Sequence, residues 1–266
     1  MDLLNYLLIF FFGSCIGSFL GVVVDRLPKN ESVLKGRSHC DYCKKSLGPL
    51  DLVPVFSFLF LGGKCRYCHR SLSIFYPVIE LLTGVLFILV ALQTGILYHV
   101  FSISYAAEFL FYLFIVSSLI SLFFIDLKYG ILPFSIIFPA TFVTLVYQIL
   151  NTKYIILSNL VAAISAFAFF LFLFLITRGR GMGFGDVVYA FFMGLLLGFP
   201  KIILGLYIAF ISGALVSLIL IIAKKKKLKG STIAFGPFLV FGTLIAIFWG
   251  NEILSLTFNF LGYTIK

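Results

Sequence analysis

Residues 112–126, YLFIVSSLISLFFID, are a long apolar run that ends in an aspartate and is followed by LKYGILP. A second boundary of this kind lies at 178–186, RGRGMGFGD, where a glycine-rich stretch ends in Asp186 and an apolar run begins. A carboxylate in or beside a helix in lipid is costly and is usually functional. We therefore expect Asp126 and Asp186 to lie at one membrane depth and to do the chemistry of this chain.

The composition indicates that the chain as a whole, and not only these two segments, belongs to a membrane protein. Of 266 residues, 62% are hydrophobic and 11% are charged, which is more apolar surface than a soluble domain of this length can bury. We predict an all-α polytopic membrane protein with about eight transmembrane helices. The expected spans are 3–24, 74–98, 109–125, 131–150, 154–176, 187–199, 202–223 and 231–249. The run 187–199 is too short to cross a bilayer alone, so part of GMGFG should lie at membrane depth.

The net charge of +10 is explained by topology and does not point to a nucleic-acid partner. The first run lacks the basic start and the cleavage site of a signal peptide, so we expect it to be retained with its N-terminus outside. The cytoplasmic loops are then 25–73, 126–130, 177–186 and 224–230. They hold all the Lys and Arg residues except Lys153, Lys201 and Lys266. The basic cluster KKKKLK (224–229) fixes this parity, and the tail 250–266 should lie outside, on the membrane surface.

We expect three domains: a first transmembrane helix (1–24), a cytoplasmic domain (25–73) and a transmembrane catalytic domain (74–266) with about seven helices. Small residues at a spacing of four in the first helix favour a packing face over a role in chemistry. These residues are Gly13, Gly17 and Gly21. No internal repeat is evident in the sequence.

The cytoplasmic domain carries two CxxC pairs, Cys40–Cys43 and Cys65–Cys68. Two such pairs suit one tetrahedral Cys₄ zinc site of the structural kind, with no position left for water. The alternatives are four free thiols, substitution of a cysteine by His39 or His69, or redox activity. The segment VPVFSFLF (53–60) between the pairs could be a re-entrant or an interfacial loop, and the sequence leaves both open.

Two carboxyl groups a few ångströms apart cannot both ionise, so Asp126 and Asp186 could share one proton. The ionised member would take a proton from water and the protonated member would hydrogen-bond the scissile carbonyl. Gly183 and Gly185 would support the second aspartate by allowing close backbone approach. The alternative is that both aspartates are ordinary boundary residues that cap helices or pair with Lys128 and Arg180.

Several ordered motifs resemble the type IV prepilin peptidases, the polytopic aspartic proteases of bacterial pilus, type II secretion and competence systems. The resemblance covers nearly the whole chain. The matching segments are GSFLGVVVDRLP (17–28), DLVPVFSFLFLGGKCRYC (51–68), YPVIELLTG (76–84), IDLKYGILP (125–133), GMGFGD (181–186) and FGPFLVFG (235–242). The chain departs from the family at Gly21, often Asn, at Phe134, often Asp, and at Val188, often Lys.

The resemblance implies that Asp126 and Asp186 are the catalytic pair of a GxGD-type intramembrane protease in the bacterial cytoplasmic membrane. It implies prepilin or pseudopilin substrates, cut after a glycine at the cytoplasmic face so that a short basic leader is removed. Many members also N-methylate the new N-terminus with S-adenosylmethionine, and Glu80 is a candidate for that activity. Glu80 could equally be a buried polar residue bonded within the helix bundle.

Two other function classes remain open from the residues alone. A proton-coupled transporter would also place acids in a bundle, but nearer the bilayer midplane and within inverted repeats. A non-catalytic membrane scaffold would use the cysteine domain to hold cytosolic partners. Substitution of the aspartates or of the cysteines would separate these readings from a protease.

Overall fold

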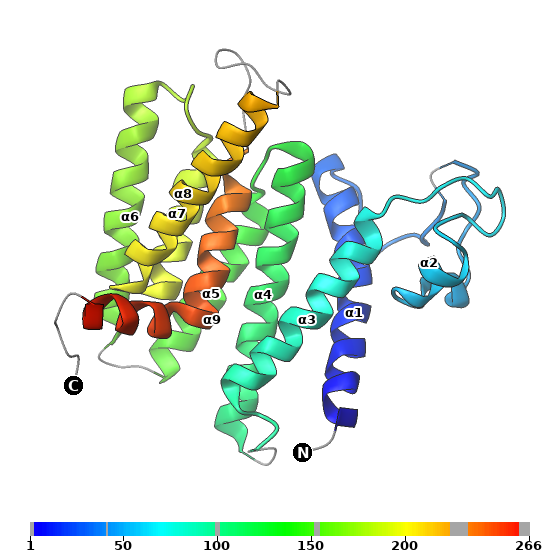
Figure 1. Cartoon of the computed structure of the whole chain (residues 1–266), viewed down its shortest axis with the longest axis horizontal. Coiled ribbons are helices and arrows are strands. Elements are labelled where there is room, and N and C mark those ends of the chain that lie inside the picture. Colours follow the sequence, from blue (N-terminus) through cyan, green and yellow to red (C-terminus); the bar gives the residue numbers. More distant parts are fainter. Residues whose placement is uncertain (1–2, 41, 99–101, 152–154, 224–233, 261–266) are drawn as a thin grey trace. The chain divides into compact units, whose positions relative to one another are not determined.

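The computed structural model describes residues 3–40, 42–98, 102–151, 155–223 and 234–260 (Figure 1). The described residues form helices joined by short loops, with two isolated β-bridges and no strand among them. The helices are α1 (Leu3–Arg26), α2 (Phe56–Phe60), α3 (Phe75–Thr94), α4 (Ile103–Tyr129), α5 (Phe134–Asn151), α6 (Ile155–Thr177), α7 (Phe184–Leu197), α8 (Lys201–Ile222) and α9 (Gly236–Phe260), with 3₁₀ helices η1 (Leu27–Lys29) and η2 (Pro49–Leu52). The predicted all-α class is confirmed.

Seven helices in the described part of the chain are long and apolar enough to cross a membrane, and α7 is a shorter apolar helix. This is a multi-pass membrane protein, with seven full-length candidates and one short helix where about eight spans were expected. The 14 residues of α7 rise only about 21 Å, as the short apolar run predicted. The cluster KKKKLK, Lys153 and Lys266, on which the predicted parity partly rests, lie outside the described residues.

The chain forms two compact units, residues 1–121 and 122–266, and α4 runs from the first into the second. In the first unit α1 packs antiparallel against α3 through small residues. A Cβ added at Gly17 would lie 2.7 Å from the Glu80 Cα, and one added at Gly84 would lie 2.7 Å from the Ser14 hydroxyl. The two helices touch at glycines because a side chain there would separate them, so the predicted packing face is confirmed.

In the second unit α7 is the central helix and packs against α5, α6, α8 and α9. Tyr189, Phe192 and Met193 of α7 are completely buried. A Cβ added at Gly194 would lie 2.6 Å from the Ala163 Cα of α6, so the two backbones are in direct contact. Because the neighbouring helices cover α7, this helix does not itself have to match the thickness of the bilayer.

The C-terminal helix α9 extends further than the expected span 231–249, because it is helical as far as Phe260. Its last part, red in Figure 1, turns away from the direction of its first part. The position of the tail from residue 250 on the membrane surface stays a prediction. Residues 261–266 of that tail lie outside the described part of the chain.

Candidate active site and metal centre

Asp126 lies in the last turn of α4, which continues to Tyr129 instead of ending at residue 125. The Asp126 carbonyl accepts a hydrogen bond from the Gly130 N–H at 2.9 Å, and Gly130 has a φ of +69°. A glycine in this conformation is the usual end of a helix, because it turns the chain back over the last carbonyls. The sequence KYG after the aspartate therefore ends α4 and leaves Asp126 inside the helix.

Asp186 lies in the first turn of α7, two residues after its start at Phe184. Its Oδ2 accepts a hydrogen bond from the Gly183 N–H at 3.0 Å. The positive end of a helix dipole also favours a carboxylate in the first turn. One oxygen of Asp186 thus caps its own helix, as the boundary-residue alternative expected, and the other oxygen takes no part in this bond.

The structure brings the two predicted aspartates together. Both side chains are buried, with 5% of Asp126 and 7% of Asp186 exposed. The carboxylates are close enough to interact electrostatically. Oδ2 of Asp126 is buried and has no hydrogen-bond partner of good geometry among the described residues. An unpartnered buried carboxylate oxygen is costly, so it is a strong candidate for contact with a substrate or a water.

Gly236 and Leu132 complete the site, and the sequence reasoning assigned no role to either. Gly236 begins α9, its backbone N–H faces the Asp126 carboxylate, and a Cβ added to it would lie 2.5 Å from Oδ2. The buried Leu132 side chain would be 3.0 Å from a Cβ on Gly236 and equally close to one on Gly185. The motif FGPFLVFG, already recognised in the sequence, was the available signal for Gly236.

The predicted support from Gly183 and Gly185 takes two forms. Gly183 supplies the N–H that caps α7, with an ordinary extended conformation at φ −79°. Gly185 supplies room, since any side chain there would meet Leu132. Phe134, where the family often has Asp, has its ring 6.3 Å from that of Phe184 in an edge-to-face contact at the start of α7.

One turn after Asp186, Tyr189 fixes α7 against α9. Its hydroxyl forms a 2.8 Å hydrogen bond with Thr243, whose own hydroxyl bonds the Leu239 carbonyl at 2.7 Å. Tyr189 and Thr243 are completely buried. A satisfied buried pair of this kind holds two helices in one register, and here it holds the helix that carries Asp186 against the helix that begins beside Asp126.

In the first unit, the four predicted cysteines form one cluster. The sulfur atoms of Cys40, Cys43, Cys65 and Cys68 all lie within 4.8 Å of one another, and the Cys40 and Cys68 sulfurs are 3.8 Å apart. A tetrahedral zinc site with bonds of roughly 2.3 Å has sulfur–sulfur edges of about 3.8 Å. The cluster can therefore hold a metal ion. His39 and His69 are not part of it among the described residues.

Each CxxC pair lies in a short loop, here called a knuckle, and the two knuckles have the same backbone structure. This corrects the expectation that the chain holds no internal repeat. Residues 38–47 and 63–72 make the same backbone hydrogen bonds at an offset of 25 positions. The matching bonds are Cys40 N–H to Lys45, Lys44 N–H to Cys40 and Leu47 N–H to Ser38 in the first knuckle, and Cys65 N–H to Arg70, His69 N–H to Cys65 and Leu72 N–H to Gly63 in the second. Only ten residues repeat, which is too short for the pattern to stand out in sequence.

Two reciprocal cation–π contacts also join the knuckles, because a basic side chain of each lies over a tyrosine ring of the other. Lys45 of the first knuckle lies 4.3 Å from the centre of the Tyr67 ring in the second, and Arg70 of the second lies 5.2 Å from the Tyr42 ring in the first. Backbone N–H groups of Cys68 and Tyr67 hold the pKa of the Cys65 thiol below its ordinary value. A thiolate is the form that binds a metal.

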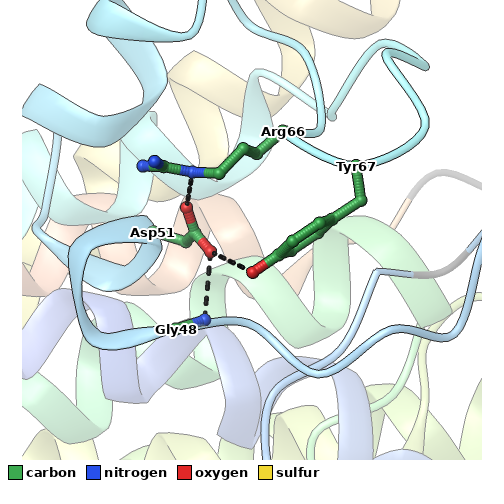
Figure 2. Close-up of polar contacts among 4 residues, drawn as sticks. All are labelled: Gly48, Asp51, Arg66 and Tyr67. Carbon is green, nitrogen blue, oxygen red and sulfur yellow. Dashed lines mark hydrogen bonds and ion pairs between the residues drawn. The ribbon is translucent and has the colours of Figure 1, made fainter.

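Asp51 ties the second knuckle to the segment between the knuckles (Figure 2). Its carboxylate accepts hydrogen bonds from the Gly48 N–H at 3.0 Å, from Arg66 Nε at 2.6 Å and from the Tyr67 hydroxyl at 3.4 Å. Burial raises the pKa of Asp51, but the bonds from Gly48 and Arg66 outweigh it and hold the pKa below its ordinary value. The loop is thus braced by charge as well as by the cysteines.

Glu80 lies at the interface of α1 and α3 with 8% of its surface exposed. Its Oε2 accepts a 2.7 Å hydrogen bond from the Val55 N–H, and the Ser18 hydroxyl of α1 also bonds this carboxylate. The reading of Glu80 as a buried residue bonded within the structure therefore has direct support. Its link to methyl transfer stays a prediction from the resemblance.

Comparison with known proteins agrees with the motifs. Residues 11–94 match the family described as "Bacterial Peptidase A24 N-terminal domain", and residues 113–218 match the "Type IV leader peptidase family". Similar curated proteins are the prepilin leader peptidase/N-methyltransferases of Bacillus subtilis (strain 168), 30% identical over 93% of this chain and 96% of the relative, and of Legionella pneumophila, 31% identical over 97% and 95%. A relative of the same name in Myxococcus xanthus (strain DK1622) is 38% identical over 49% of this chain and 36% of its own. No solved structure matches.

Proposed function

Because this chain belongs to the type IV leader peptidase family, we propose that it is an intramembrane aspartic endopeptidase that removes the leader from prepilins or pseudopilins. The observation that carries the proposal is the convergence of Asp126 and Asp186 as two buried, interacting carboxylates. Two acids in this relation are the machinery that peptide hydrolysis without a covalent intermediate needs.

In the proposed reaction the two carboxyl groups hold one proton between them. The ionised carboxylate takes a proton from water while the protonated one donates a hydrogen bond to the scissile carbonyl. The water oxygen bonds to the carbonyl carbon, a proton passes to the amide nitrogen, and the C–N bond breaks. Asp186 is positioned by its bond from Gly183, and Oδ2 of Asp126, which makes no other hydrogen bond to the described residues beyond the Gly236 N–H it faces, is the oxygen proposed to contact the water or the carbonyl.

The proposed substrate has a short basic leader, a glycine before the cut and an apolar helix after it. The leader stays at the cytoplasmic face of the bacterial inner membrane, and the apolar helix enters the bilayer. The two aspartates lie in terminal turns of α4 and α7, at the helix ends proposed to face the cytoplasm. The proposed topology places the N-terminus outside and the loop 25–73 in the cytoplasm. This orientation is supported by the concentration of Lys and Arg in that loop.

N-methylation of the new N-terminus with S-adenosylmethionine is part of the proposal, because the full-length relatives carry both activities in their names. Zinc is the proposed metal of the four cysteines, with a structural role, because all four ligand positions are filled by protein. A bound zinc ion would cross-link the two knuckles, and it would take no part in hydrolysis.

The deciding experiment incubates the purified protein with a prepilin, with and without S-adenosylmethionine, and measures the mass of the product's N-terminal peptide. We expect a leader of defined length to be lost, and a gain of about 14 Da when the methyl donor is present. Asp186→Asn should insert and fold normally but yield no cleaved product. Cleavage by Asp186→Asn at the normal rate would remove this residue from the mechanism.

The same preparations separate the competing functions. Proton uptake into vesicles that depends on the aspartates, without cleavage, would favour a transporter. Loss of function only on cysteine substitution would favour a scaffold. Elemental analysis should find one zinc per chain, and Cys40→Ser should lose it together with the fold of residues 25–73, because such sites supply much of the folding free energy of small domains.

A further inference from the structure

The segment between the two knuckles carries a group of exposed apolar side chains that the proposed catalysis does not use. These side chains are Leu50 (71% exposed), Phe56 (51%), Leu59 (66%) and Phe60 (87%). They belong to η2 and α2, inside the otherwise basic loop 25–73. Exposed apolar side chains clustered in this way mark a surface that meets another apolar phase.

A hydrogen bond fixes the depth of this segment against the membrane helices of the same unit. Val55, just before α2, donates its N–H to Glu80, which is also bonded by Ser18. Ser18 lies eight residues before the end of α1 at Arg26, or about 12 Å along the helix. Glu80 lies five residues inside α3, or about 7.5 Å from its start at Phe75. Val55 therefore lies well below the helix ends, at the level of the apolar spans.

Most of the backbone N–H groups of this segment have protein partners, as lipid requires of non-helical chain. In hydrocarbon every backbone polar group needs a protein partner. After Val55 the N–H groups of Phe56, Ser57, Leu59 and Leu61 bond to the carbonyls of Pro54, Val53, Val55 and Ser57, and the next two N–H groups, of Gly62 and Gly63, bond back to Leu59 and Phe58. Pro54 has no N–H to satisfy. The Val55 N–H donates its hydrogen bond outside the segment, to the Glu80 carboxylate.

The backbone conformation of Val55 indicates that its surroundings impose the position of this segment. Val55 has a φ of +63°, which is a genuine outlier for a β-branched residue. Such a conformation persists only where the surroundings impose it. The bond to Glu80 supplies that constraint, so the carboxylate has a reason to be buried that is separate from chemistry.

From these observations we infer that residues 53–61 form a re-entrant segment whose apolar side chains contact the acyl chains of the bilayer, and that Glu80 is the positioning residue that holds it there. This decides between the re-entrant and interfacial alternatives that the sequence left open. Only four residues, Leu61–Lys64, separate α2 from Cys65, so the cysteine domain is held close to the membrane surface. The inference does not depend on peptide cleavage.

Tryptophan quenching by lipids tests the depth directly, because the chain has a single tryptophan, Trp249. In a Trp249→Phe background, Phe60→Trp and Leu34→Trp are compared in vesicles that contain phospholipids brominated on the acyl chains. Leu34 lies in the same basic loop and is 84% exposed, against 87% for Phe60. We expect strong quenching at position 60, several-fold above that at position 34. Equal and weak quenching at both positions would overturn the inference, and Leu59→Trp serves if Phe60→Trp does not fold.

The role of Glu80 has its own matched pair of variants. Glu80→Gln keeps a side-chain oxygen that accepts the Val55 N–H, whereas Glu80→Ala removes it. In the Phe60→Trp protein we expect Glu80→Gln to keep the quenching and Glu80→Ala to reduce it at least two-fold. Unchanged quenching in Glu80→Ala would show that the segment stays in the lipid without this residue. Neither result depends on whether prepilin is cleaved, so the proposed function is tested separately.

Discussion

Glu80 in the first unit and Asp126 in the second are both buried carboxyl groups in apolar helices, but their oxygens have opposite surroundings. Glu80 accepts hydrogen bonds from Val55 and Ser18. Asp126 faces a single backbone donor, the Gly236 N–H, and its buried Oδ2 makes no other hydrogen bond among the described residues. The comparison teaches that burial alone does not identify a catalytic acid. A buried carboxylate that accepts several hydrogen bonds holds a structure together, whereas one with few partners keeps the capacity to bind a reactant.

Replacing each acid by its amide should give the largest difference between the two sites. Asp126→Asn should lower the cleavage rate about 10³-fold or more, because the amide cannot exchange a proton with water or substrate. Glu80→Gln should leave the cleavage rate within a few-fold, since its task is to accept a hydrogen bond. Prepilin processing followed by mass spectrometry measures both, and a similar loss in the two variants would erase the distinction.

Truncating Glu80 tests the structural half of the comparison. Glu80→Ala leaves the Val55 N–H without a partner, which should destabilise the first unit by about 1–3 kcal/mol. Thermal unfolding in detergent, or resistance of residues 25–73 to protease, measures this effect against Glu80→Gln. Equal stability of the two variants would mean that the Val55 bond contributes nothing.

Gly236 offers a smaller, geometric change beside Asp126. An added methyl group would lie 2.5 Å from Oδ2 and 3.0 Å from Leu132, so Gly236→Ala should displace the carboxylate. Because displacement by about 1 Å can cost 10²-fold, we expect a 10- to 100-fold slower cleavage. Gly250→Ala in the same helix is the control, since its methyl group would meet only the flexible Lys201 side chain at 3.3 Å. A normal rate in Gly236→Ala would show that this contact is irrelevant to catalysis.

Asp51 in the cytoplasmic loop should give the smallest effect, and one that depends on pH. Its pKa is lowered in the folded protein, so its stabilising effect is complete above its ordinary pKa of about 4 and is lost as the pH falls through the lower folded value. Asp51→Asn should reduce amide-exchange protection around Gly48 a few-fold at pH 7. The difference from the unaltered protein should shrink below about pH 4. A difference that is constant across this range would mean that the charge of Asp51 is not responsible.

The fold class and the identity of the candidate site could be predicted from the sequence because both depend on local patterns. Apolar runs indicated the helices, and the short run after Asp186 correctly indicated a helix too short to cross a bilayer. The CxxC spacing indicated one four-cysteine cluster, which is confirmed as a group of sulfurs within 4.8 Å. Helix ends were less accurate, as at α4 and α9, because capping and packing extend helices past their apolar cores.

Tertiary structure alone decided which atoms meet. Motif order named Asp126 and Asp186, but their convergence, the approach of Gly236 to Oδ2 and the Tyr189–Thr243 bond depend on helices that are distant in sequence. The repeat of the two knuckles and the bond from Val55 to Glu80 were likewise invisible in one dimension. The reason is physical: the sequence sets the polarity of each segment, whereas the surroundings of a buried carboxylate are set by the partners that packing brings to it.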